Sequence, residues 1–335
     1  AVGCATAMHP LLPERIAAAG HAVWAAGALL SALELGVFTE LGKGPRTRLQ
    51  LQRRLGLSSV SAPDFLDALV GLGWLDREGD DDDAVYLNTR ESGHFLDRHQ
   101  PHYLGDLLQA GHESLRGHSV ALTAMLRGRD AGAGRPDGPG RSALREHLAR
   151  LHGDALAAAF DFSPCAHLLD IQGAAGRLAC AIALANPHLH GTTLERAEQV
   201  SRAQDHIERC ALGGRVAVAT RPGALRLPAP LPAADVIVAS LVLRADAMAW
   251  LPALLRQARA ALTTGGCLLV IDHLLDDARR ASAPAMLLSL SRRVNGEAHV
   301  PATRGDVRDA CLGAGFSRTD CLGLLDGASA VIARP

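Results

Sequence analysis

The sequence lacks the features that mark several classes of protein. Its formal net charge is −1, with no basic stripe and no acidic tail, so nucleic-acid binding is not expected. Its seven cysteines form no CxxC pair, and most lie in apolar runs, which indicates reduced core residues of a cytoplasmic protein. No apolar run is expected to reach the roughly 18 residues of a membrane span, and no signal peptide is expected.

The histidines do not form a metal-binding pattern either. Five of them lie between residues 88 and 128, a segment that we expect to be a helical connector: His94, His99, His102, His112 and His118. No pair among them has a third ligand nearby in the sequence, so we expect surface or pocket-lining positions and no metal. The Gly-, Pro- and Arg-rich segment 127–141 predicts a flexible loop, and residues 142–160 predict a further helix.

What the sequence does contain is typical of a globular protein. It has 335 residues, 48% hydrophobic and 21% charged, which predicts one large or two ordinary domains. Arginine almost wholly replaces lysine, and Lys43 is the only lysine. The composition therefore allows an ample core but does not indicate a function.

The N-terminal part predicts short helices followed by a β-hairpin. Helices are expected at 16–35, 48–55 and 61–72, with Ser61 as an N-cap, and the hairpin is expected at 74–87. This order is typical of a winged helix. The segment in the place of the recognition helix carries Asp64 and Asp67 and no Arg or Lys, so a dimerisation role is favoured over DNA binding.

From residue 166 onward, strands and helices alternate, which predicts a doubly wound α/β domain. Strands are expected at 166–171, 190–194, 215–219, 235–240, 267–272, 319–324 and 329–333, the last two as an antiparallel hairpin at the sheet edge. Helices are expected at 177–185, 197–211, 247–262, 282–293 and 304–313.

The stretch 166–195 is the centre of this pattern. A buried strand leads into a turn that contains Gly173 and Gly176, a helix follows, and a second strand ends at Glu195. Glycine lets a ligand approach the backbone, N–H groups at the helix start face that ligand, and the acid accepts hydrogen bonds from ribose hydroxyls. The order predicts a nucleoside site, and the alternative is a tight turn that binds no ligand.

Together these stretches resemble the small-molecule O-methyltransferases that use S-adenosylmethionine and carry a winged-helix dimerisation domain. The resemblance runs from Leu11 to Arg334 and is carried by residues 32–38 (ALELGVF), 65–73 (FLDALVGLG), 86–89 (YLNT), 261–266 (ALTTGG), 268–271 (LLVI) and 314–316 (AGF). It implies an α/β fold with three parts: a winged-helix dimerisation domain at 1–98, a helical connector with substrate-pocket helices at 99–160, and a Rossmann-like methyltransferase domain at 161–335. It also implies a homodimer, a small-molecule substrate, and binding of S-adenosylmethionine or S-adenosylhomocysteine.

The resemblance assigns cofactor contacts to Asp170, Gln172, Gly173, Gly176, Glu195, Arg221 and Ser240. Two of these depart from the family pattern. Gln172 stands where a glycine is expected, at the edge of the methionine part of the cofactor. Arg221 stands where an Asp lies near the adenine amino group in the family.

The catalytic position departs most. In the family a His just after the fourth strand deprotonates the acceptor, whereas this chain has Arg244 there, and arginine stays protonated near neutral pH. The acids that orient the His also fail to align, since Asp272 is a shortened version of one of them. We predict a catalytic group of Arg244, Asp246 and His273, with Asp246 orienting the arginine and His273 as acid or base. The alternatives are a surface salt bridge between Arg244 and Asp246, and an exposed loop histidine.

Three functions follow from this pattern. The first is a tailoring enzyme for polyketide or aromatic natural products that has diverged from methyl transfer to cyclisation, isomerisation, decarboxylation or hydroxylation. The second is an active O- or N-methyltransferase, and the third is a non-catalytic partner of an active relative. Candidate walls of the substrate pocket are His112, Met125, Trp250 and Met286, for which the alternative is ordinary core packing.

Overall fold

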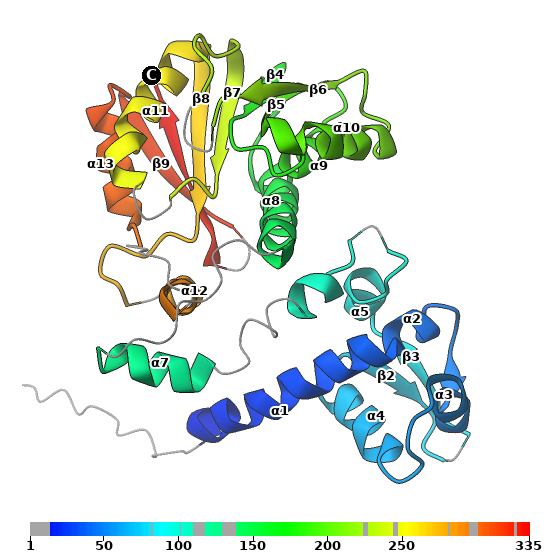
Figure 1. Ribbon diagram of the computed structural model, residues 1–335. Helices are drawn as coiled ribbons and strands as arrows, with labels where there is room; N and C mark the ends of the chain where they lie inside the picture. Colours follow the sequence, from blue (N-terminus) through cyan, green and yellow to red (C-terminus); the bar gives the residue numbers. More distant parts are fainter. Residues whose placement is uncertain are drawn as a thin grey trace, which may run out of the picture. The chain divides into compact units, whose positions relative to one another are not determined.

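The computed structural model describes residues 14–81, 83–100, 102–109, 118–128, 139–223, 227–243, 247–280, 282–294, 301–324 and 327–335. The chain forms two compact units, Ala1–Glu113 and Ser114–Pro335 (Figure 1). Residues 99–113 thus group with the first unit, and the three-part division expected from the sequence stays a prediction.

The first unit combines short helices with a small antiparallel sheet. Its sheet has the order β1-β3-β2, from the strands β1 (Arg46–Thr47), β2 (Leu75–Glu78) and β3 (Val85–Asn88). Its helices are α1 (Glu14–Leu35), α2 (Val37–Leu41), α3 (Arg48–Leu55), α4 (Ala62–Gly71) and α5 (Arg90–Phe95). The predicted helices and the hairpin are confirmed.

Local signals mark the starts of α2 and α3, whereas the expected cap of α4 is absent. Gly36 has a φ of 74° and separates α1 from α2, a conformation that suits glycine. Thr47 begins α3 with a reciprocal capping box, in which its hydroxyl and the Gln50 side chain each accept a backbone N–H. The prediction that Ser61 caps α4 is wrong: Ser61 has φ −96° and ψ −20°, and its side chain makes no capping bond, so Pro63 in the first turn is the remaining start signal.

Helix α1 is apolar and poorly covered within this chain. Trp24 is 82% exposed and Ile16 80% exposed. The segment Ile16–Leu35 is a 20-residue helix, long and apolar enough to cross a membrane, so the expectation that no apolar run reaches that length is wrong. One such helix is weak evidence for a span, because a helix that packs in a protein interior passes the same test. An apolar helix face of this size needs a partner surface.

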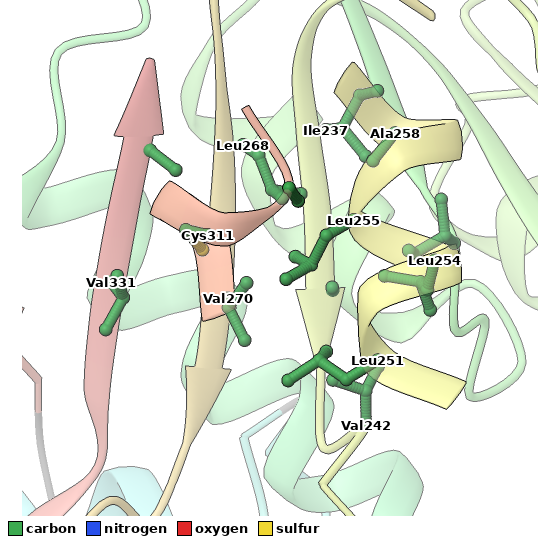
Figure 2. Close-up of a cluster of buried hydrophobic side chains, with 14 of the residues drawn as sticks. Ile237, Val242, Leu251, Leu254, Leu255, Ala258, Leu268, Val270, Cys311 and Val331 are labelled. Carbon is green, nitrogen blue, oxygen red and sulfur yellow. The ribbon is translucent and has the colours of Figure 1, made fainter. Parts of the chain in front are cut away.

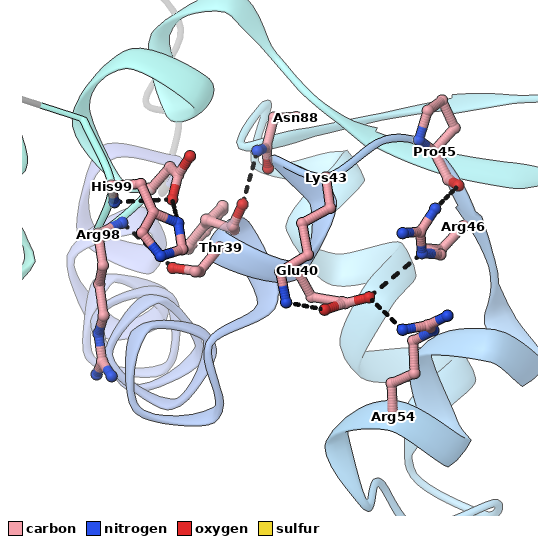
Figure 3. Close-up of polar contacts among 11 residues, drawn as sticks. Thr39, Glu40, Lys43, Pro45, Arg46, Arg54, Asn88, Arg98 and His99 are labelled. Carbon is pink, nitrogen blue, oxygen red and sulfur yellow. Dashed lines mark hydrogen bonds and ion pairs between the residues drawn. The ribbon is translucent and has the colours of Figure 1, made fainter.

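The first unit holds a buried carboxylate surrounded by cations (Figure 3). Glu40 lies at the end of α2, 2.8 Å from Lys43 Nζ, 3.3 Å from Arg46 Nε and 3.3 Å from Arg54 Nη1. The hydrogen bond from Lys43 is the largest of the effects that lower the pKa of Glu40. Nearby, the Asn88 side chain donates to the Phe38 carbonyl and joins β3 to α2.

Replacing Glu40 by glutamine is expected to lower the free energy of unfolding by about 1 kcal/mol at pH 7, because three cations lose their common partner. The effect stays modest because the Lys43 and Arg54 side chains are 56% and 57% exposed. A carboxyl whose pKa is lowered by folding stabilises above its ordinary pKa of 4.5, and the difference should disappear as pH falls below that value. Urea titrations at pH 7 and pH 3 test this, with exposed Glu34→Gln as the control, and an equal loss at both pH values would contradict it.

The second unit is built on a seven-stranded sheet of order β6-β5-β4-β7-β8-β10-β9. Strands β4 to β8 run parallel, and β10 is antiparallel to both β8 and β9. The strands are β4 (His167–Asp170), β5 (His190–Arg196), β6 (Val216–Arg221), β7 (Ala234–Ser240), β8 (Leu262–Asp272), β9 (Arg318–Gly323) and β10 (Ser329–Arg334). The helices are α7 (His118–Leu126), α8 (Pro139–Ala159), α9 (Arg177–Ala185), η1 (Ala197–Gln199, a 3₁₀ turn), α10 (Val200–Arg209), α11 (Ala247–Ala261), α12 (Ala283–Val294) and α13 (Arg304–Gly313).

Helices cover both faces of this sheet, as the doubly wound prediction requires. Figure 2 shows one face, where Leu251 and Leu255 of α11 and Cys311 of α13 pack against Ile237 of β7 and Val270 of β8. The opposite face packs against α8, α9 and α10. Neighbouring residues of each strand alternate between the two clusters, because side chains of a strand point to opposite faces. Burial on both faces explains why these strands read as continuous apolar runs.

Candidate active site

The turn after β4 is held by a buried carboxylate. Asp170 Oδ1 accepts the backbone N–H groups of Gln172 at 3.1 Å and Gly173 at 3.2 Å, and its Oδ2 accepts the Thr193 hydroxyl at 3.2 Å. Burial raises the pKa of Asp170 to about 6, against the opposing effect of these hydrogen bonds. Asp170 therefore fixes the path of the backbone and is not free for direct contact with a ligand.

The same turn runs through four successive residues with positive φ. The values are 77° at Gly173, 62° at Ala174, 55° at Ala175 and 70° at Gly176. Glycine takes this conformation at no steric cost, whereas each alanine costs about 1–2 kcal/mol. The two alanines thus store strain at this turn, where the family pattern has a glycine at position 174.

Glu195 lies directly over Gly173. A Cβ added to Gly173 would collide with both oxygens of the Glu195 carboxyl group, so a side chain at this position would displace that group. Glu195 Oε1 accepts the Gly176 N–H at 2.8 Å. Burial, and next the charge of Asp170, raise the pKa of Glu195 to about 8. The predicted ribose acid is therefore placed at the turn with its carboxyl group against the two glycines.

Arg221 reaches across the neighbouring strand to this turn. It ends β6, and its guanidinium donates to the Gly223 carbonyl at 3.0 Å and to the Gln172 carbonyl at 3.5 Å. Because β5 lies between β6 and β4, the side chain must pass over the end of β5, where Glu195 lies. Burial lowers the pKa of Arg221, and Glu195 acts in the opposite direction. The base side of a nucleoside site here would meet hydrogen-bond donors and a positive charge.

A second polar group lies at the ends of β7 and β8. Ser240 Oγ is 3.0 Å from Nδ1 of His152, a residue of α8, and both side chains are buried. The His152 and His273 rings lie 5.7 Å apart between centroids, tilted by 50°. Burial, and next the charge of His273, lower the pKa of His152 to about 4. Sequence reasoning missed His152, because nothing in the local pattern of α8 points to a strand 88 residues away.

Asp272 connects the loops that follow these two strands. Its Oδ2 accepts the Leu243 N–H at 3.1 Å, and its Oδ1 accepts the His273 N–H at 2.9 Å. The carboxylate thus holds the start of the loop that leads to Arg244. Asp272 is buried and bonded to backbone, so it positions both loops.

The remaining predicted residues are only partly described. Arg244, Asp246 and His112 lie outside the described residues. Met125 on α7 and Met286 on α12 are half-buried, on two helices that contact each other. Trp250 packs against the hydrophobic cluster of α11 and the sheet, which matches the core-packing alternative.

A group of three possible metal ligands lies at α9 and α10. The ligand atoms of Cys180, His206 and Cys210 are within 4.8 Å of one another. Arg177 Nη1 lies 3.0 Å from His206 Nδ1 and can only donate, which leaves the imidazole proton on Nε2. That nitrogen is the one nearer Cys210 Sγ, at 3.7 Å, so the group in this arrangement is hydrogen-bonded and not set up for a metal.

Comparison with known proteins matches both units to one family. Residues 141–317, more than half of the chain, match the O-methyltransferase domain, and residues 20–98 match the O-methyltransferase dimerisation domain. The chain is 33% identical to the tetracenomycin polyketide synthesis 8-O-methyltransferase of Streptomyces glaucescens over 84% of this chain and 85% of that protein. It is 34% identical to an N,N-dimethyltransferase of Streptomyces rimosus, over 76% of each.

Two further similarities complete the picture. Over 36% of this chain and 31% of the relative, it is 40% identical to the aclacinomycin 10-hydroxylase of Streptomyces purpurascens. Among solved structures, human N-acetylserotonin methyltransferase in complex with S-adenosylmethionine superimposes with a TM-score of 0.77 at 22% identity, covering 98% of this chain and 99% of the other.

Proposed function

The chain belongs to the O-methyltransferase family with an N-terminal dimerisation domain, and on that premise we propose that it is an S-adenosylmethionine-dependent methyltransferase of natural-product tailoring. The proposed acceptor is a hydroxyl or amino group of a polyketide-like or aromatic small molecule. The similarity to a polyketide 8-O-methyltransferase supports a polyketide-like acceptor with a hydroxyl group, and the similarity to an N,N-dimethyltransferase supports an amino group as the alternative acceptor.

One observation carries the proposal: the carboxyl group of Glu195 occupies the space that only Gly173 leaves open. This cradle fits the ribose of a nucleoside, with Glu195 as hydrogen-bond partner for the hydroxyls and Gly173 and Gly176 allowing close approach. Ser240, at the end of the neighbouring strand, would meet the methionine side of S-adenosylmethionine. Arg221 is the poorest fit, since it cannot accept a hydrogen bond from the adenine amino group.

The residues of this site would bind the cofactor and position the acceptor. S-adenosylmethionine, when bound, supplies an electrophilic methyl group on a sulfonium. Asp170 holds the turn through two backbone N–H groups, and Glu195 binds and orients the ribose. Asp272 holds the loops beyond β7 and β8 beside the acceptor. Positioning of this kind supplies a large part of the rate in a bimolecular transfer.

Calorimetric titration with S-adenosylmethionine and S-adenosylhomocysteine tests the proposal. Micromolar binding of both is expected, followed by methylation of at least one member of a panel of hydroxynaphthoates, hydroxyanthraquinones and aminated tetracyclic compounds. A folded protein that binds neither compound at millimolar concentration would rule the proposal out.

Replacing Arg221 by aspartate is expected to tighten binding of S-adenosylhomocysteine about tenfold, because the carboxylate accepts from the adenine amino group and no cation faces the base. Calorimetry on wild type and variant measures this, and exposed Arg209→Asp is the control. Arg215→Asp is unsuitable as a control, because Arg215 Nη1 donates to four backbone carbonyls. Weaker binding by Arg221→Asp would show that arginine is itself the favourable contact.

A second candidate function is a tailoring reaction other than methyl transfer, as the sequence first indicated. Arg244 in the place of the family base favours it, and so does the similarity to a hydroxylase over about a third of the chain. Mass spectrometry of products separates the two, since methyl transfer adds one CH₂ to the acceptor and releases S-adenosylhomocysteine. The loss of methyl transfer stays a prediction.

The exposed apolar face of α1 and the match to a dimerisation domain support a homodimer. A purely non-catalytic partner would use the same surface. Light scattering after gel filtration is expected to give twice the 35.1 kDa of the chain. An enzyme is expected to turn over substrate as the homodimer alone, whereas a non-catalytic partner is expected to show no turnover by itself.

A further inference from the structure

We propose that His273 accepts the proton released by the acceptor at this site, and that buried His152 is the residue that positions it together with Ser240. This inference rests on the proposed function, since it names the base of that reaction. His273 would take the role of the family's catalytic histidine, because this chain has Arg244 at the position of that histidine.

Polar side chains converge at the ends of β7 and β8. Three elements bring polar side chains to one place: His152 from α8, Ser240 from the end of β7, and His273 from the residue after β8. Leu241 N–H donates to the Ile271 carbonyl at 2.8 Å, which fixes the ends of β7 and β8 side by side. The cluster lies at the carboxyl ends of β7 and β8, and β7 is the neighbour of β4, whose following turn contacts Glu195. This is the sheet edge at which ligands of doubly wound folds bind.

The two imidazoles differ in burial. His152 is 3% exposed, whereas His273 is only half-buried. A buried histidine cannot meet a substrate, but a half-buried one at the carboxyl edge can. The roles therefore divide: His273 faces the ligand side, and His152 lies behind it.

The charged groups around the two imidazoles also distinguish them. Among the described residues, the titratable groups that act on His152 are His273, which disfavours a proton there, and Asp272, which favours one. Because His152 is the more buried of the two rings, a proton that enters this cluster belongs on His273. His152 stays neutral and shares a fixed hydrogen bond with Ser240, which keeps the hydroxyl and the neighbouring ring in one arrangement.

The step itself is a single proton transfer. The O–H or N–H bond of the acceptor breaks, an N–H bond forms on the His273 imidazole, and the imidazolium later returns the proton to water. General base catalysis of this kind contributes roughly 10²–10⁴-fold to a rate.

The test for His273 uses the wild-type protein and His273→Ala with S-adenosylmethionine and the best acceptor of the panel above. The kcat is expected to fall by about 10²–10⁴-fold, with the dissociation constant of S-adenosylhomocysteine unchanged within threefold. Added imidazole is expected to restore part of the rate. Unchanged kcat in His273→Ala would overturn the proposal, and so would a rate loss with S-adenosylhomocysteine binding lost as well.

The test for His152 compares two variants. Asparagine can place a polar atom near the position of Nδ1 and keep the bond to Ser240, whereas leucine cannot. His152→Leu is expected to lower kcat about tenfold or more with the acceptor KM nearly unchanged, and His152→Asn to recover most of it. His147→Asn is the control, because His147 lies on the same helix, is half-buried, and also has its pKa lowered to about 4. Equal losses in His152→Leu and His147→Asn would mean that the helix, not the cluster, matters.

A second measurement does not depend on any acceptor. Histidine-labelled protein, followed by long-range proton–nitrogen NMR spectra, is expected to show that the His152 ring stays neutral down to about pH 5, since its pKa is lowered to about 4. A His152 ring that becomes charged above pH 5 would overturn the proposal. Failure of the proposed function would show separately, as absence of S-adenosylhomocysteine binding.

Discussion

Replacing Gly173 by alanine is expected to weaken S-adenosylhomocysteine binding by about 100-fold or more. The added Cβ would collide with both oxygens of the Glu195 carboxyl group, so Glu195 must leave its position. Because the pKa of Glu195 is raised to about 8, this carboxyl is mostly neutral at pH 7, and each ribose hydrogen bond is worth about 0.5–1.5 kcal/mol. A displaced, buried carboxyl left unpaired costs about 1–3 kcal/mol more, and the sum amounts to roughly two factors of ten. Isothermal calorimetry on a variant shown to be folded by circular dichroism measures the loss.

Two further changes separate this effect from general damage. A Cβ added to Gly213 would meet no atom within 4 Å, so Gly213→Ala is expected to bind like wild type. Ala174 has a φ of 62°, so Ala174→Gly removes strain of about 1 kcal/mol and is expected to keep or improve both binding and stability. Tight binding by Gly173→Ala would show that Glu195 is not the ribose partner.

The second large effect is a dependence of stability on pH that comes from Glu195. Its pKa is raised from 4.5 to about 8 in the folded protein, so the folded state holds a proton that the unfolded state releases. The stability that this group contributes is fully present below pH 4.5 and is lost as pH rises to about 8. Between pH 6.5 and 8 the loss is on the order of 2 kcal/mol.

Other shifted groups also titrate in this window, so the variant is compared with wild type at each pH. His147, His152 and His206, whose pKa values are lowered to about 4, are still partly protonated in the unfolded state at pH 6.5 and therefore add stability as pH rises. The difference in unfolding free energy between wild type and Glu195→Gln, measured by urea titration at each pH, is expected to fall by on the order of 2 kcal/mol between pH 6.5 and 8. Exposed Glu208→Gln is the control and should keep the wild-type slope. The same slope in Glu195→Gln as in wild type would contradict the assignment.

The sequence predicted those elements whose boundaries depend on local chemistry. Helices α9 and α13 begin and end at the predicted residues, because a glycine-containing turn and Thr303 mark their starts. β8 instead begins at Leu262, five residues before the predicted start. The Thr-Thr-Gly-Gly stretch suggests a turn. In the structure Leu262 pairs with Ala234 of β7, the register then shifts, and regular pairing with β7 resumes at Cys267.

The candidate site was predictable only where one motif contains it. Gly173, Gly176 and Glu195 follow one another in a βαβ unit, and the structure brings them together. Arg221 was noticed only as a departure from a pattern, and its reach to the Gln172 carbonyl depends on strand order. His152 meets Ser240 through packing of α8, and such long-range contacts leave no periodic signal in a sequence.

The order of strands in the sheet has a consequence for how the second unit forms. β10 lies between β8 and β9, yet it follows β9 in the chain. During synthesis, residues 318–323 therefore emerge before β10, the strand with which they pair in the described part of the chain. Until β10 is made, the parallel strands can pair but the antiparallel part of the sheet cannot form. The nascent protein passes through a stage in which β8 is an unprotected edge of apolar residues, which is the kind of surface that chaperones bind and that aggregates in their absence.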